Sequence, residues 1–187
     1  MTQVLERPQI AKYTVLEYHK ILEAGIFSEG VKTELIDGEV YIMPPMGGEH
    51  YGILARLTTE LSVKLHTKAV PISQVPMEIS DTTEPEPDFI VLTYREDYYR
   101  KRKGTPAEAL LFIEVSKSTL EHDRYIKLPK YAETGIKEVW IINATKENYT
   151  LEVYSEPVGD EYTKIQKYAE GKLVAPLEFP NVPIRWW

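Results

Sequence analysis

The sequence predicts an α/β domain in which a mixed central sheet is flanked by helices. Two short apolar runs, Phe89–Leu92 and Leu110–Ile113, have the length and composition of buried strands. A helical pattern from about Glu121 to Thr134 follows the second run and ends at Gly135. It leads into another apolar strand, Glu138–Ile142. The order strand, helix, strand is typical of a crossover between parallel strands.

The segment before these strands predicts a helix, a hairpin and a second helix. The stretch Thr14–Glu17 has the pattern of a capping box, and Gly25 ends the helix that it begins. Within Lys32–Met43, the dipeptide Asp37-Gly38 separates two apolar pairs, which is a strong hairpin signal. From His50 onward, apolar residues recur at helical spacing and predict a long helix that packs on the sheet. These residues are Ile53, Leu54, Leu57, Leu61 and Leu65.

The remaining segments complete the predicted sheet. Val70–Ile79 alternates in character but contains two prolines, which favours an edge strand. Thr150–Tyr154 and Tyr162–Tyr168 predict a hairpin, and Lys172–Trp187 predicts a final short strand and a tail.

Length and composition restrict the class of protein. The 187 residues, 43% of them hydrophobic, are enough for one domain with a substantial core. We divide it into an N-terminal helix and hairpin (1–50), a core with the catalytic candidates (51–143), and a C-terminal hairpin and tail (144–187). The absence of cysteine excludes disulfides and thiolate metal sites. The net charge of −7 argues against nonspecific coating of nucleic acid, which needs a broad basic surface.

The sequence shows no signal for export or membrane insertion. No apolar run approaches the roughly 18 residues that a membrane span requires. The opening stretch, MTQVLERPQI, lacks the basic and apolar regions of a secretory signal. We therefore expect a soluble, cytoplasmic protein with no membrane partner.

Two acidic residues stand at the ends of the predicted central strands. Asp88 follows Pro87 and opens the first apolar run, and Glu114 closes the second. Burying a carboxylate costs several kcal/mol unless a cation or a proton compensates it, so the pair suggests a shared cation. With the backbone carbonyl of Val115, the two acids offer hard oxygen ligands that suit Mg²⁺ or Mn²⁺. Such a site suits phosphodiester hydrolysis, because the metal acidifies water and offsets charge on the phosphate.

The helix after the second acid supplies a candidate cation. Side chains alternate along a strand, so Lys117 lies on the face opposite Glu114. Asp123 and Lys127 are four residues apart on one helical face, and Lys127 can return over the sheet towards Glu114. Its ammonium would orient the attacking water or offset the phosphate charge.

A basic stretch with interleaved tyrosines lies between the two central strands. Its cations are Arg95, Arg100, Lys101, Arg102 and Lys103, and its aromatic residues are Tyr94, Tyr98 and Tyr99. The cations could hold the phosphate backbone of DNA while the tyrosines stack on bases or sugars. The same stretch also fits a solvated loop whose tyrosines rest on the edge of the sheet.

These residues resemble the PD-(D/E)XK nuclease superfamily, which has a restriction-endonuclease-like fold. Pro87-Asp88 and Glu114–Ser116 stand at its motif positions, but Ser116 takes the place where the superfamily usually has lysine. Nearly the whole chain is similar to a bacterial family of this superfamily named as restriction endonucleases. The matching positions are Glu34–Glu39, His50, Pro87, Asp88, Glu114–Ser116, Ser118, Thr119, Asp123, Lys127, Tyr131, Gly135 and Glu138–Trp140.

The resemblance implies roles for particular residues. In such families the lysine has moved to the helix after the acid strand, which corresponds to Lys127. An acid of the first hairpin or helix, here Glu34, often completes the metal site, and His50 is a candidate general base. Ser116 and Asp123 would contact the ligands rather than the metal.

The acids and the lysine also have purely structural interpretations. Asp88 can begin a turn or a strand. Glu34 can form a cross-strand ion pair in the hairpin, and Lys127 can pair with Asp123 on the helix surface.

The histidines and hydroxyl residues have similar alternatives. His50 can bond to nearby backbone at the start of its helix. Ser116, Ser118 and Thr119 can cap the helix that follows them. Three further histidines show no metal-ligand spacing and are expected at the surface: His19, His66 and His122.

A Mg²⁺-dependent DNA endonuclease, with Mn²⁺ as a substitute metal, is the function we predict. The same fold could instead be a noncatalytic DNA-binding or oligomerisation module, which the displaced lysine permits. As a third alternative, Glu114 with Asp88 or Glu34 could form a metal-free carboxylate pair for glycoside hydrolysis. The tail Ile184–Trp187 contains two tryptophans, and exposed tryptophan suggests a contact such as a homodimer interface.

Overall fold

The computed structural model describes residues 10–145 and 148–185. Nearly all of the opening stretch that we expect to lack an export signal lies outside the described residues. Trp186 and Trp187, on which the predicted dimer contact depends, also lie outside them. Within the described part of the chain, no helix has both the length and the apolar character needed to cross a membrane.

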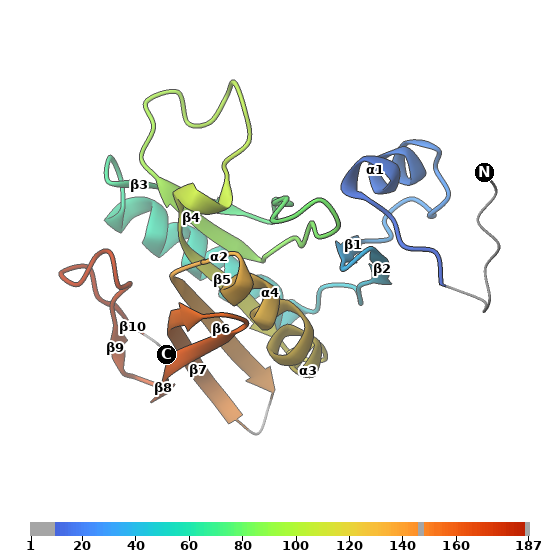
Figure 1. The fold of residues 1–187 in the computed structure, drawn as a ribbon. Helices are drawn as coiled ribbons and strands as arrows, with labels where there is room; N and C mark the ends of the chain where they lie inside the picture. The colour runs from blue at the N-terminus through green and yellow to red at the C-terminus, as the bar shows by residue number, and fades with distance from the viewer. Residues whose placement is uncertain (1–9, 146–147, 186–187) are drawn as a thin grey trace, which may run out of the picture.

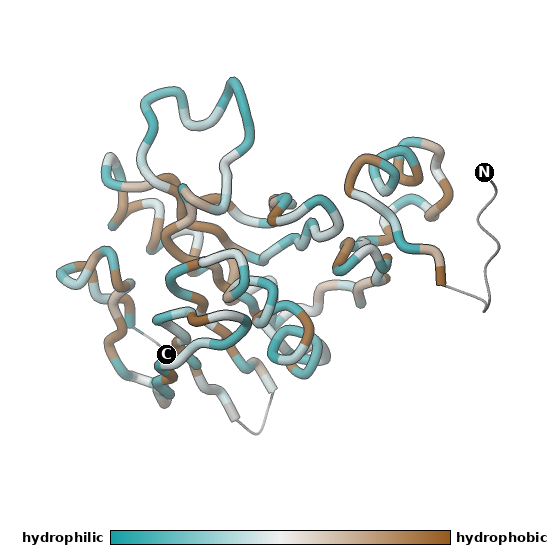
Figure 2. Tube along the Cα trace, in the orientation of Figure 1, coloured by the Kyte–Doolittle hydropathy of each residue, from teal (hydrophilic) through white to brown (hydrophobic). Residues whose placement is uncertain are grey.

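A six-stranded mixed sheet forms the centre of the molecule, as the sequence predicts (Figure 1). From edge to edge its strands are β3 (Ala69–Ser73), β4 (Phe89–Thr93), β5 (Ala109–Ser116), β6 (Glu138–Thr145), β7 (Asn148–Val158) and β8 (Glu161–Ala169). Neighbours β5 and β6 are parallel, which confirms the crossover, and the other neighbours are antiparallel. Figure 2 shows hydrophobic residues gathered in the central strands and hydrophilic residues in the loop after β4.

The edge strand β3 is shorter than the predicted Val70–Ile79. It ends at Ser73, and Pro76 lies in the connection that follows. Proline has no N–H to donate to a neighbouring strand, so it is tolerated at the edge and disfavoured within a ladder.

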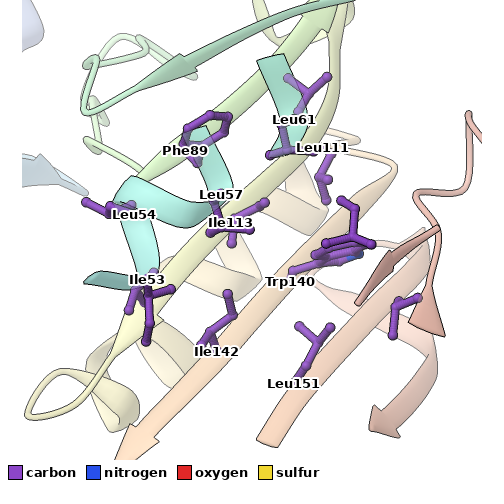
Figure 3. Close-up of a cluster of buried hydrophobic side chains, with 14 of the residues drawn as sticks. Ile53, Leu54, Leu57, Leu61, Phe89, Leu111, Ile113, Trp140, Ile142 and Leu151 are labelled. Carbon is purple, nitrogen blue, oxygen red and sulfur yellow. The ribbon is translucent and has the colours of Figure 1, made fainter. Parts of the chain in front are cut away.

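Helix α2 (Gly48–Lys64) covers one face of the sheet, as predicted (Figure 3). Its apolar residues pack on alternate residues of the strands, because side chains alternate between the two faces of a sheet. The contributors shown in Figure 3 are Ile53, Leu54, Leu57, Leu61, Phe89, Leu111, Ile113, Trp140, Ile142 and Leu151. The indole Nε1 of Trp140 donates to Glu138 Oε1 at 2.8 Å, so its burial leaves no donor unpaired.

The opposite face is covered by a helix that changes its winding. It consists of α3 (Leu120–His122), a π-helical turn η2 (Asp123–Lys127) and α4 (Leu128–Glu133). The helix predicted over about 121–134 is therefore present, and its middle turn has the wider π winding. Pro129, in the first turn of α4, cannot donate to the carbonyl four residues earlier, and the wider turn immediately precedes it. Tyr131 packs edge-on against Phe112 of the sheet, with ring centres 4.9 Å apart.

A small lobe lies to one side of the sheet and consists of α1 (Val15–Glu23) with the hairpin β1 (Thr33–Ile36) and β2 (Glu39–Ile42) (Figure 1). The predicted capping box at the start of α1 is present. Asp37 and Gly38 have φ values of 50° and 78°, as a tight hairpin turn requires. The connection between β3 and β4 reaches this lobe, where Leu35 and Glu84 exchange backbone hydrogen bonds of 3.3 and 2.7 Å. These bonds bring β1 close to the start of β4.

The C-terminal segment packs against the α2 side of the sheet. The strands β9 (Leu173–Val174) and β10 (Ile184–Arg185) pair with each other, so two short strands replace the single one predicted. Val174 and Ile184 join the core cluster of α2. Lys64 Nζ donates to the carbonyl of Pro183 at 2.8 Å and ties the segment to the helix.

Leu61→Ala should lower the free energy of unfolding by about 2–5 kcal/mol, because it leaves a cavity at a fully buried position between α2 and the sheet. Val63→Ala is the matched control on the same helix, since Val63 is 73% exposed and should change stability by less than about 0.5 kcal/mol. Urea unfolding followed by circular dichroism measures both changes. Equal losses in the two variants would show that α2 presents a different face to the sheet.

Candidate active site

Four acidic side chains and one lysine gather where β4 begins and β5 ends. They come from β1, the start of β4, β5 and the π-helical turn η2, and each is at most 6% exposed: Glu34, Asp88, Glu114, Asp123 and Lys127. The pairing of Phe89 with Ile113, extended by one residue, sets Asp88 opposite Glu114. We call this group the carboxylate–lysine cluster.

The ammonium of Lys127 lies among the carboxylates of three elements. Its Nζ is 2.7 Å from Glu114 Oε1, 3.2 Å from Glu34 Oε2 and 3.9 Å from Asp123 Oδ1. The side chain therefore does return over the sheet from the helix. Burial alone would lower the pKa of Lys127, but the charges of Glu114, Glu34 and Asp123 outweigh burial and raise it. Lys127 is consequently a permanent buried cation.

Glu114 is the acid whose proton affinity changes most clearly. Burial raises its pKa to about 8, the charge of Lys127 opposes this shift, and the charges of Asp123, Asp88 and Glu34 add to it. The hydroxyl of Tyr131 donates to Glu114 Oε1 at 2.5 Å. The carboxyl of Glu114 therefore needs a proton or a further cation near neutral pH.

Asp88 is fixed from two sides. The backbone N–H of Val115 donates to Oδ2 at 2.8 Å, and Nε2 of His50 lies 2.8 Å from Oδ1. His50 therefore contacts a carboxylate of the cluster rather than nearby backbone. Its position at the start of α2 brings the helix and the strand together at the acid.

Ser116 contacts Asp123 instead of capping the helix. Its Oγ donates to Asp123 Oδ2 at 2.7 Å, and both side chains are buried. Thr119, which precedes the first turn of α3, makes no side-chain capping bond. The capping alternative therefore fails for these two residues, and Ser116 holds an acid of the cluster in place.

A pocket of about 180 Å³ opens beside the cluster. Three of the acids, Glu34, Asp88 and Asp123, line it, together with His50. The other lining residues are Lys32, Met43, Pro44, Pro45, Met46, Gly47, Gln74, Glu86, Lys117, Ser118 and Thr119. The cluster therefore borders a solvent-accessible pocket.

The donor chemistry of the cluster suits a hard divalent cation. Four carboxylates of the cluster are buried, and three of them lie within 4 Å of the buried ammonium of Lys127. Oε2 of Glu34 accepts no hydrogen bond, although it lies 3.2 Å from that ammonium. Among the described residues, no three histidine or acidic side chains are close enough to hold a metal ion as they stand, because Lys127 lies between the acids. The carboxylate oxygens nevertheless fit Mg²⁺ in their chemical type and in their negative charge.

The predicted DNA-contacting residues lie away from this pocket, on the loop between β4 and β5. Arg95 pairs with Asp97 at 3.0 Å, and Arg102 forms two hydrogen bonds of 2.6 and 2.7 Å with Glu108. Lys103 lies 3.6 Å from Glu84. Arg100 and Lys101 are exposed on the same loop.

Two residues contribute to the site in ways that the sequence analysis missed. Tyr131 is named in the sequence analysis only as a position of the family resemblance, yet its hydroxyl donates to Glu114 directly. His122 was expected at the surface, but it is half-buried, its ring centre is 4.8 Å from that of Tyr41, and its Nε2 is buried without a partner. The position of His122 next to Asp123 was the one available signal. Burial lowers its pKa.

Comparison with known proteins gives a consistent family and fold. Residues 15–185 match the family model Uma2, described as "Putative restriction endonuclease". No curated protein matches the chain. A crystal structure of a putative nuclease belonging to DUF820 from Anabaena variabilis superposes with a TM-score of 0.68 at 18% sequence identity, covering 90% of this chain and 92% of that one. The relative supports the fold, and the match over nearly the whole chain shows that this protein belongs to the Uma2 family of putative restriction endonucleases.

Proposed function

We propose that the protein is a Mg²⁺-dependent endonuclease that hydrolyses the phosphodiester bonds of DNA, with Mn²⁺ as a substitute metal. The observation that carries this proposal is the carboxylate–lysine cluster beside a solvent-accessible pocket. Membership of a family described as restriction endonucleases supports the choice of reaction and of substrate.

The metal would be held by oxygens of the cluster. Asp88, Glu114 and the carbonyl of Val115 are the proposed ligands, and Oε2 of Glu34, which forms an ion pair with Lys127 but accepts no hydrogen bond, could complete the set. When bound, Mg²⁺ supplies Lewis-acid chemistry, because it acidifies water in the site and offsets the charge that develops on the phosphate.

Lys127 adds a fixed positive charge to the same place. Because its ammonium is buried and stays protonated, it can offset phosphate charge or orient a water molecule without exchanging its proton. Tyr131 restrains Glu114, and Ser116 restrains Asp123. His50 restrains Asp88 and is the nearby candidate for moving a proton.

The loop after β4 would hold the DNA backbone. Arg100 and Lys101 are exposed and can approach phosphates, whereas Arg95 and Arg102 are occupied by acidic partners. A homodimer would allow both strands of a duplex to be cut. Light scattering of the purified protein decides its oligomeric state.

One observation favours a second candidate, a noncatalytic module on the same fold. Lys127 already contacts the carboxylates of Glu34 and Glu114, so the cluster could serve only to hold β1, β5 and η2 together. Titration calorimetry separates the two candidates. Heat from Mg²⁺ or Mn²⁺ binding that disappears in Glu34→Gln and Asp88→Asn supports the nuclease, and an absence of binding supports the module.

The wild-type protein should nick supercoiled DNA in the presence of Mg²⁺. Asp88→Asn and Glu114→Gln should each slow nicking at least about 100-fold, because each removes a proposed carboxylate ligand of the metal that stabilises the transition state. Glu121→Gln is the matched control, since this neighbouring acid has a side chain that is 77% exposed. Gel electrophoresis of supercoiled, linear and branched DNA measures the rates. Nicking that survives both substitutions, or none on any of these substrates, would refute the proposal.

Lys127→Met should abolish nicking and lower the free energy of unfolding by about 3–5 kcal/mol near neutral pH, because it leaves buried carboxylates without a counter-ion. The loss should shrink at acidic pH, where those carboxyls take up protons. Lys130→Met is the control on the same helix, because Lys130 forms part-exposed ion pairs with Asp37 and Glu133 and should cost at most about 1 kcal/mol. A small loss for Lys127→Met in urea unfolding would contradict the assigned burial.

The melting temperature of the metal-free protein should fall as pH rises from about 5 to about 8. Folded Glu114 has a pKa of about 8, and the ordinary value is 4.5, so the folded state binds more protons across this window. Stability is therefore lost as pH rises, and Glu114→Gln should remove most of the slope. Each kcal/mol corresponds to about 2–4 °C in a chain of this size. Calorimetric scans at several pH values measure the trend.

Mg²⁺ should raise the melting temperature more at about pH 8 than at about pH 6, because the ion competes less with the proton of Glu114, whose pKa is about 8. Glu138 provides the control. Burial also raises its pKa, but it bonds to Trp140 and Leu177 away from the cluster. Glu138→Gln should leave the Mg²⁺ increment unchanged, and equal increments at both pH values would argue against Glu114 as a ligand.

A further inference from the structure

A second cavity, of about 390 Å³, lies between the β3–β4 edge of the sheet and the loop that follows β4. Its floor is apolar and is formed by Ile72, Val75, Pro76, Met77, Ile90 and Leu92. The continuous segment 98–104 of the loop forms its wall. Cavities of this size and character are typical of sites for small flat ligands.

Contacts within the chain hold the loop wall in place. Tyr99 is 8% exposed, and its hydroxyl donates to the carbonyl of Thr93 at 2.8 Å. The guanidinium groups of Arg95 and Arg102 lie 5.2 and 5.7 Å from the centre of its ring. Two hydrogen bonds from Arg102 to Glu108 anchor the far end of the loop. The cavity is therefore a built feature of the fold.

Backbone strain places a second tyrosine at the mouth of this cavity. Tyr98 and Tyr99 have φ values of 49° and 59°, a left-handed conformation that residues with a Cβ rarely adopt. Such strain persists where the surroundings impose it, and it is concentrated at ligand sites. This backbone conformation directs Tyr99 into the protein and leaves Tyr98 56% exposed. The ring of Tyr98 lies edge-on to that of Tyr94, with ring centres 6.0 Å apart.

Positive charge gathers around the cavity of an otherwise acidic protein. Four consecutive cations, Arg100 to Lys103, line it, and the described lining residues include no carboxylate, although the chain has a net charge of −7. An apolar floor, an aromatic ring at the mouth and cations on the rim match a flat base attached to phosphates. A base inside a continuous duplex is stacked and paired, so it would enter such a cavity only after flipping out of the helix, at a cost of about a few kcal/mol that an unpaired base does not incur.

We infer that this cavity takes one unpaired nucleobase of a DNA strand, stacked on Tyr98, while Arg100 and Lys101 hold the adjoining phosphates. The inference rests on the proposed function and names its substrate class, which is single-stranded DNA or a duplex with an unpaired base. Asp88 immediately precedes β4, and Ile90 of the cavity floor lies two residues after it, about 7 Å farther along the chain. One DNA strand can therefore engage both the cavity and the carboxylate–lysine cluster.

The test is a thermodynamic cycle between Tyr98 and one base, measured by fluorescence anisotropy in EDTA so that no DNA is cut. Labelled single strands carry an abasic site at each position in turn. Tyr98→Ala should weaken binding of the intact strand about 5- to 150-fold, which corresponds to about 1–3 kcal/mol for one stacked base. An abasic site at one position should weaken binding by the wild type to a similar degree. The same abasic site should not weaken binding by the Tyr98→Ala variant further.

Two further variants separate stacking from unrelated effects. Tyr98→Phe should bind like the wild type, because the ring alone is needed. Tyr125→Ala is the matched control, since Tyr125 is 67% exposed on η2, outside the lining of the cavity, and should leave binding unchanged. Melting temperatures of all variants establish that each is folded.

Several results would overturn the inference. Equal losses for Tyr98→Ala on intact and abasic strands would show that no base occupies the cavity. Stronger binding to a fully paired duplex than to single strands would also argue against an unpaired base in the cavity. Binding to phosphatidylserine vesicles that depends on Tyr98 would assign the cavity to a lipid instead. If the effects of Tyr98→Ala and of the abasic site are coupled but the Mg²⁺-loaded protein does not nick DNA, the proposed hydrolysis is refuted and the base site stands. If the protein nicks DNA but the two effects are independent, only the base site is refuted.

Discussion

The buried ammonium of Lys127 is the interaction on which the candidate site depends. It contacts acids from the first hairpin, from the central strand β5 and from its own helix. An unpaired charge in a protein interior costs several kcal/mol, so each of these elements is held where its carboxylate can reach the lysine. The small N-terminal lobe is thereby tied to the sheet by charge as well as by the backbone bonds between Leu35 and Glu84.

Lys127 lies on the helix, and a serine of strand β5 supports the turn that carries it. Ser116, at the position where the sequence resemblance leads us to expect a lysine, donates to Asp123, which lies four residues before Lys127 on η2. The π-helical turn that carries both residues precedes Pro129, where a regular helix would lose a hydrogen bond. Deviations of this kind are frequent at functional sites.

Strand β4 separates two environments of opposite charge. At its start, buried carboxylates outnumber the single lysine and favour a divalent cation. Along its other residues and the loop that follows, cations surround an apolar cavity. For the proposed nuclease, this cationic loop would offer DNA a local positive surface although the chain as a whole carries a net charge of −7.

The sequence by itself determined the order of elements, the apolar face of α2, the hairpin at Asp37-Gly38 and the acids at the strand ends. These features follow from local periodicity, turn chemistry and the cost of burying charge. Only the tertiary structure decided that Lys127 meets Glu34, 93 residues away, that Tyr131 holds Glu114, and that Arg102 is occupied by an acid. The contacts of Lys127 and Tyr131 depend on how separate segments pack, and the bond of Arg102 to Glu108 depends on how the loop between them folds back, so local pattern does not determine them.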